Sequence, residues 1–197
     1  MIRTKLRVAI GCSGSIGVIN LPQYLVELQK IDCEIKVVMS ESSRKFLQPM
    51  VIESLVHNEV ITDEMQKGTG EALHMRLIQW CDLLIVLPAT ANTIGKIANG
   101  IADNVLTTAV IACNNPVIII PNMNESMWAS KIVTKNVEAL KSFDFTVIEP
   151  ILQNTYISSE KSYKQTLSML QPKQLLNVLN HLLEGSFTET NRKEPSI

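Results

Sequence analysis

Short apolar segments alternate with longer amphipathic segments along this chain of 197 residues. The apolar segments are rich in β-branched residues and lack the apolar-polar alternation of a strand with one face in water. Such segments are typical of parallel strands that are buried on both faces. They are Leu6–Ile10, Ile35–Met39, Leu83–Leu87, Val117–Ile120 and Thr146–Ile148.

Apolar residues at helical spacing predict helices between these strands. The apolar faces consist of Leu21, Leu25 and Leu28 in a first helix, Ile94, Ile97 and Ile101 in a later one, and Ile132, Val133, Val137 and Leu140 in another. Alternating strands and helices predict an α/β fold with a three-layer, doubly wound parallel sheet of the flavodoxin-like or Rossmann-like kind.

The pattern predicts one domain over residues 1–184. Within it, residues 153–170 are polar and have no clear period, so we expect a mobile loop there. A last helix is expected from Pro172 to Glu184, and the polar residues 185–197 are expected to be a disordered tail.

Composition excludes several classes of function. The formal net charge of −1 provides no field for nucleic acid or an acidic membrane. No segment approaches the roughly 20 apolar residues that span a bilayer. The four cysteines contain no CxxC pair, which argues against a zinc site or a disulfide framework and favours a cytoplasmic protein.

Candidate chemistry gathers in four segments that each follow an expected strand: GCSGSIG (11–17), SESS (40–43), PATANT (88–93) and PNMNESMW (121–128). Ligands of open α/β sheets bind beyond the carboxyl ends of the strands, so these loops are expected to meet at one site. They are rich in small, hydroxyl and amide residues.

The first two loops suit a nucleotide but are not specific for one. Small residues in the first loop allow a phosphate close to the backbone at a helix start, although the loop is neither a Walker motif nor GxGxxG. An ordinary tight turn is the alternative. In the second loop Glu41 would suit a ribose, but the flanking hydroxyls suit phosphate or flavin atoms better. The alternative role there is a helix N-cap by Ser42 or Ser43.

The third and fourth loops carry a specific resemblance. Residues 86–108 resemble the PASANT segment of the flavin-containing cysteine decarboxylases, with Thr90 where the motif has Ser. Residues 121–128 match that family's PxMNxxMW motif at every fixed position, and His74 has the offset of its active-site histidine. The resemblance covers about residues 6–180 and includes phosphopantothenoylcysteine decarboxylases and the peptidyl-cysteine decarboxylases of lantibiotic biosynthesis.

The resemblance implies a flavin and a flavodoxin-like flavoprotein domain. FMN is expected because nothing in the sequence points to a separate adenine pocket, and FAD is the alternative. The resemblance also implies a homo-oligomer, a trimer or a dodecamer of four trimers, with each flavin at a subunit interface. Small residues at 95, 98, 100 and 102 suit such an interface, and ordinary helix–sheet packing is the alternative. The flavin contacts implied are Gly14, Ser15, Ile16, Ser40, Ser42, Thr90, Ala91, Asn92, Thr93 and Asn122.

The same resemblance gives catalytic roles to two residues. His74 corresponds to the base that takes the substrate thiol proton, and imidazole suits such work near neutral pH. Asn124 corresponds to the carboxylate-binding asparagine, and Met127 lines the same pocket. His57 and His181 match no motif and are interpreted as surface or helix residues.

Residues 155–164 separate the family's branches, because the pantothenoyl branch has a cysteine there and this chain has none. The segment resembles the substrate clamp of the lantibiotic enzymes, which implies substrate contacts by Tyr156, Ser158 and Ser159. The sequence therefore favours oxidative decarboxylation of a precursor peptide ending in cysteine, giving an aminoenethiol. Alternatives are a phosphopantothenoylcysteine decarboxylase, a flavin prenyltransferase and a non-enzymatic flavin-binding regulatory protein.

Overall fold

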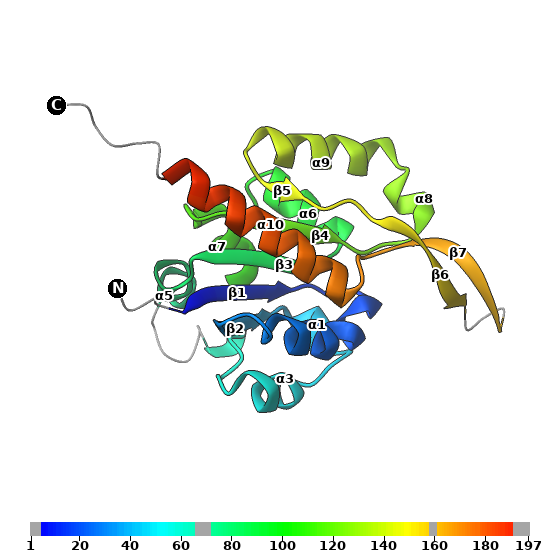
Figure 1. The fold of residues 1–197 in the computed structure, drawn as a ribbon. Helices are drawn as coiled ribbons and strands as arrows, with labels where there is room; N and C mark the ends of the chain where they lie inside the picture. The colour runs from blue at the N-terminus through cyan, green and yellow to red at the C-terminus, as the bar shows by residue number, and fades with distance from the viewer. Residues whose placement is uncertain (1–4, 66–71, 158–160, 191–197) are drawn as a thin grey trace.

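The computed structural model describes residues 5–65, 72–157 and 161–190, and its centre is a parallel sheet in the order β2-β1-β3-β4-β5 (Figure 1). The strands are β1 (Leu6–Cys12), β2 (Cys33–Met39), β3 (Leu83–Ala89), β4 (Val117–Pro121) and β5 (Thr146–Val147). The five expected strands and the doubly wound α/β fold are confirmed. Strand order reverses between β1 and β3, and this switch point is where such sheets bind ligands.

Helices cover both faces of the sheet (Figure 1). They are the 3-10 helix η1 (Ile16–Asn20) and the α-helices α1 (Leu21–Leu28), α2 (Glu41–Arg44), α3 (Pro49–Val56), α5 (Leu73–Trp80), α6 (Ala91–Ala98), α7 (Val105–Ala112), α8 (Glu125–Trp128), α9 (Lys131–Ser142) and α10 (Pro172–Thr190). Alternate residues of each inner strand enter two different cores. In β1, Ile10 packs with α1, α3 and α10, whereas Ala9 packs with α5, α6, α7 and α9.

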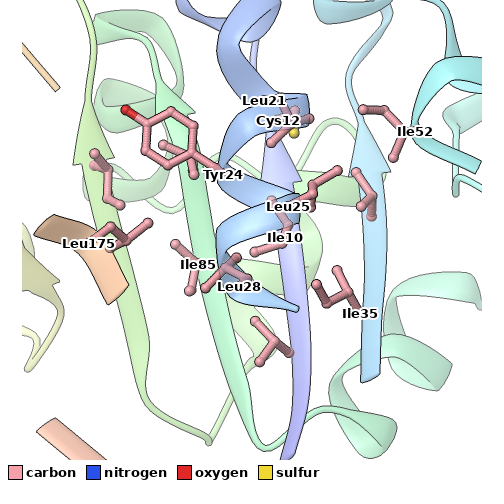
Figure 2. Close-up of a cluster of buried hydrophobic side chains, with 14 of the residues drawn as sticks. Ile10, Cys12, Leu21, Tyr24, Leu25, Leu28, Ile35, Ile52, Ile85 and Leu175 are labelled. Carbon is pink, nitrogen blue, oxygen red and sulfur yellow. The ribbon is translucent and has the colours of Figure 1, made fainter. Parts of the chain in front are cut away.

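The predicted apolar face of α1 is confirmed. Leu21, Leu25 and Leu28 are almost completely buried, and Figure 2 shows them beside Ile10 and Ile85 of the sheet. Burying each leucine contributes about 1.5–3 kcal/mol relative to an exposed side chain.

Two expected core positions are wrong. Ile101 is 47% exposed because α6 ends at Ala98 and Gly100 adopts a positive φ of 70°, which turns the chain out of the helix. Ile132 lies in the first turn of α9 and is 74% exposed, so the buried face of that helix consists of Val133, Val137 and Leu140.

The segment 153–170 contains strands, which corrects the expected loop, while its mobility stays a prediction. It is largely an antiparallel hairpin of β6 (Ile151–Ile157) and β7 (Ser162–Ser168), which extends beyond the carboxyl ends of the sheet (Figure 1). Cross-strand pairs such as Asn154 with Gln165 satisfy the backbone without a buried face, so no apolar period marks the strands. Leu152, for example, is 64% exposed.

The last helix is longer than expected. α10 runs to Thr190 instead of Glu184, so the start of the expected disordered tail is helical, and residues 191–197 lie outside the described part of the chain. Leu175 and Leu179 of α10 are buried against the sheet. Among the helices of the described residues, none has the length and apolarity required to cross a membrane.

Candidate functional site

The four loops surround one hollow of about 810 Å³ beyond the carboxyl ends of the strands. Its size is in the range of small-molecule and cofactor sites. Ten of the residues selected from the sequence line it: Gly14, Ser15, Ser40, Ser42, Thr90, Ala91, Asn92, Thr93, Asn122 and Met127. The structure therefore brings together residues that are more than 100 positions apart in the chain.

Buried hydroxyl groups fix the loops against one another. The Ser13 hydroxyl donates to the Pro88 carbonyl at 2.8 Å and accepts from the Thr90 backbone N–H at 2.8 Å, which joins the first loop to the third. The Ser15 hydroxyl donates to the side-chain oxygen of Asn122 and joins the first loop to the fourth. These bonds hold the loops in place before any ligand binds.

Three loops begin a helix with a capping side chain. Ser40 caps α2, Thr90 caps α6 and Asn124 caps α8, each accepting from the backbone N–H three residues later. The expected N-cap by Ser42 or Ser43 is wrong, because Ser40 already has the extended backbone of an N-cap (ψ 157°). Threonine is also a favoured N-cap residue, so Thr90 at the serine position of PASANT keeps the cap of α6.

Gly14 is where the first and second loops meet. A Cβ atom at this position would lie 2.3 Å from the Ser42 Cβ and 3.0 Å from its carbonyl carbon. Any side chain here would push the second loop outward. Both loops line the hollow. Glycine at position 14 therefore keeps the two loops close together and leaves the backbone of residue 14 accessible.

We expect Gly14→Ala to lower the free energy of unfolding by about 1–3 kcal/mol through overpacking and to reduce the flavin that copurifies with the protein. Absorbance of the acid-released flavin per chain and a urea unfolding curve measure the two effects. Full flavin content in Gly14→Ala would show that the close packing of Gly14 against Ser42 is not needed for flavin binding.

Charged groups at the hollow, which the sequence reasoning missed, are paired. Lys96 binds Asp103 at 2.5 Å and lowers the pKa of that carboxyl group, and Arg44 pairs with Glu64. Asp63 accepts from the Val105 backbone N–H at 2.7 Å. Lys96 and Asp103 lie inside segment 86–108, which resembles the family motif, so their position in that segment could have identified them as site residues. Asp63 follows no motif and could not be selected.

The remaining site residues lie elsewhere. Within the described residues, His74, Ile16 and Asn124 are not among those lining the hollow; His74 is half-buried in the first turn of α5, and Ile16 is 62% exposed in η1. Asn124 sits between the lining residues Met123 and Met127. Tyr156 lies in β6, while Ser158 and Ser159 lie outside the described residues.

The other two histidines agree with their expected roles. His57 is exposed and ends α3 with a positive φ of 53°, and His181 is exposed on α10. Neither is among the described residues at the hollow. His74 is therefore the one histidine of the three with a proposed catalytic role, and that role comes from the family resemblance.

Comparison with known proteins gives a family match over residues 2–180, to the model described as Flavoprotein. The epidermin decarboxylase of Staphylococcus epidermidis is 35% identical over 179 residues, which are 91% of this chain and 95% of that protein. The phosphopantothenoylcysteine decarboxylase of Mus musculus is 34% identical over 148 residues, covering 73% of this chain and 72% of the relative.

Solved structures have the same fold. A variant of EpiD complexed with the substrate peptide DSYTC has a TM-score of 0.80 at 33% identity, covering 88% of this chain and 98% of that one. The FMN-dependent cysteine decarboxylase SpaF has a TM-score of 0.70 at 35% identity, covering 80% of this chain and 89% of that one. These similarities agree with the fold of the chain.

Proposed function

This chain belongs to the Flavoprotein family, whose members similar to it include flavin-dependent cysteine decarboxylases, and we propose that it oxidatively decarboxylates the C-terminal cysteine of a peptide. The observation that carries the proposal is the convergence of the four small-residue loops on one hollow, in a chain that matches a peptidyl-cysteine decarboxylase over 91% of its length. A ribosomal precursor peptide of the lanthipeptide type is the proposed substrate, and the cytoplasm is the proposed location.

FMN is the proposed cofactor, and the residues that line the hollow have the groups to bind it. Glycine at position 14 leaves backbone accessible between two loops, and the hydroxyl and amide groups of Ser15, Thr90 and Asn122 add hydrogen-bonding capacity without charge. These groups would hold a phosphate and the polar edge of the ring. When bound, the flavin supplies the acceptor for the hydride that leaves the cysteine Cβ.

The chain's own residues would handle the proton and the carboxylate. His74 would take the thiol proton as the Cβ hydride leaves, which converts the thiol to a thioaldehyde. The Asn124 amide would hold the carboxylate without neutralising it, so that departure as CO2 stays favourable and an ene-thiolate remains. Oxidation is needed because an ordinary cysteine carboxylate would leave a carbanion with no group to delocalise its charge.

A subunit interface would bring His74 to the site. The family resemblance implies such an interface, and His74 is not among the described residues that line the hollow of one chain. We therefore propose a homotrimer or a dodecamer of four trimers, in which His74 of one subunit serves the flavin loops of the next.

The peptide branch of the family is favoured by the hairpin. No cysteine follows Cys113 in the sequence, so β6 and β7 contain none to protonate an ene-thiolate intermediate. Cys12 is a poor substitute, because this last residue of β1 is fully buried in the core and burial raises its pKa (Figure 2). The product would therefore leave oxidised, as an aminoenethiol.

An anaerobic single turnover tests the proposal. With a peptide that ends in cysteine, we expect the flavin absorbance to bleach and stay bleached until air is admitted. The peptide mass should fall by one CO2 and two hydrogen atoms. Parallel reactions use a peptide ending in serine and phosphopantothenoylcysteine. Turnover of phosphopantothenoylcysteine alone, with flavin recovering without air and a saturated thiol product, would make the chain a phosphopantothenoylcysteine decarboxylase.

A non-enzymatic flavin-binding protein is the alternative from another class. It predicts a yellow protein that changes neither substrate. A protein purified without flavin would contradict both proposals.

A further inference from the structure

Two cysteines separated by 31 residues in the sequence meet at the amino-terminal edge of the sheet. Cys81 is the C-cap of α5, Cys113 is the C-cap of α7, and these helices pack against each other. The two thiols lie close enough for each to shift the pKa of the other. The hollow formed by the four loops lies at the opposite, carboxyl edge, so this pair belongs to a different part of the molecule.

Asn115 holds the two chain segments together. Its amide nitrogen donates to the Cys81 carbonyl at 2.7 Å and to the Ile78 carbonyl at 3.3 Å, both at the end of α5. The Asn115 carbonyl accepts from the Cys113 thiol at 3.7 Å. One residue therefore fixes the distance between the two helix ends that carry the thiols.

The two thiols differ in access and in acidity. Cys113 is half-buried and lines a second surface hollow of about 880 Å³, whereas Cys81 is 3% exposed. The contact with Cys81 lowers the pKa of Cys113, and the same contact together with burial raises the pKa of Cys81. Cys113 is thus the more accessible and the more acidic of the two thiols, and Cys81 is the buried thiol near it.

We propose that Cys113 and Cys81 are a modification site for a hydroperoxide, at which Cys113 is oxidised first and Cys81 then closes a disulfide. The Cys113 thiolate attacks one peroxide oxygen, the O–O bond breaks, and the leaving hydroxide takes a proton to form water. The Cys81 sulfur then loses its proton and attacks the resulting sulfenic acid. The S–O bond breaks and a second water leaves. Two thiols and one hydrogen peroxide give one disulfide and two waters.

The other two cysteines provide controls within the same chain. Cys33 is also half-buried, but burial raises its pKa to about 11, and Cys12 is fully buried with a raised pKa. Accessibility alone would treat Cys33 and Cys113 alike. The proposal predicts that iodoacetamide modifies Cys113 at least roughly tenfold faster than Cys33 at neutral pH, because the thiolate is the nucleophile.

The decisive experiment treats the flavin-containing protein with hydrogen peroxide, blocks the remaining thiols and digests the protein without reductant. Mass spectrometry should find a peptide linked through Cys81 and Cys113, with two hydrogens lost, that dithiothreitol separates. In Cys81→Ser, dimedone should trap a sulfenic acid at Cys113, and in Cys113→Ser, Cys81 should stay reduced.

Peroxide treatment that leaves both thiols reduced in the wild-type protein would overturn the proposal. So would accumulation of Cys113 sulfinic acid without the disulfide, or reaction of Cys33 as fast as Cys113. These measurements on the wild-type chain need no substitution, so a variant that fails to fold does not affect them.

Discussion

His74→Asn should retain its flavin and lose turnover by a factor of roughly 100 to 10,000, the usual effect of removing a general base. Retention is expected because His74 is not among the described residues lining the hollow, which the flavin loops form without it. Flavin absorbance per chain and peptide turnover by mass spectrometry are the two measurements. Turnover near that of the wild type would remove His74 from the mechanism.

The same variant tests whether the site is shared between subunits. Coexpression of His74→Asn with Asn124→Asp should restore measurable activity, because some mixed sites would combine His74 from one chain with Asn124 from the other. Light scattering should show a trimer or a multiple of it. Mixed assemblies without any restored activity would place both residues in one chain's site.

Asn124→Asp should lose activity while keeping the fold. The Asn124 side chain accepts from the Met127 backbone N–H at 2.8 Å, and aspartate caps a helix equally well. A carboxylate here would repel the substrate carboxylate and lower kcat/KM by a factor of roughly 30 or more, corresponding to about 2–5 kcal/mol for an unpaired charge.

Asn124→Ser is the matched variant, since serine keeps the cap without the charge or the amide. We expect it to fall between the wild type and Asn124→Asp in activity, with all three alike in thermal unfolding. An active Asn124→Asp would rule out the carboxylate contact. Loss of thermal stability in Asn124→Asp alone would mean that the cap, and not the substrate, had been disturbed.

The sheet could be predicted from the sequence because its strands are buried on both faces. Segments such as Leu83–Leu87 are short, apolar and rich in β-branched residues, which is typical of strands buried on both faces. The loops after them could be predicted as a site because parallel strands bring their carboxyl ends to one edge. Ten of the selected residues accordingly line one hollow.

What could not be predicted depends on geometry without a periodic signal. The hairpin of β6 and β7 is stabilised by cross-strand backbone bonds, and its polar faces look like a loop in the sequence. Helix α7 was missed because its residues, VLTTAVIA, are apolar on nearly every side, so no face stands out. The contact between Cys81 and Cys113 has no spacing signature, since it depends on how two helices end.

The hairpin of β6 and β7 also affects whether copies of this protein associate at high concentration. Within the described residues, β6 and β7 pair only with each other, so each leaves one edge of backbone donors and acceptors open. Open edges invite pairing between molecules, and charged residues such as Lys164 oppose it. An extended peptide can occupy the same edge. The open edges that allow self-association would therefore also bind an extended substrate peptide. Because backbone groups make these contacts, they would depend little on the sequence of the peptide.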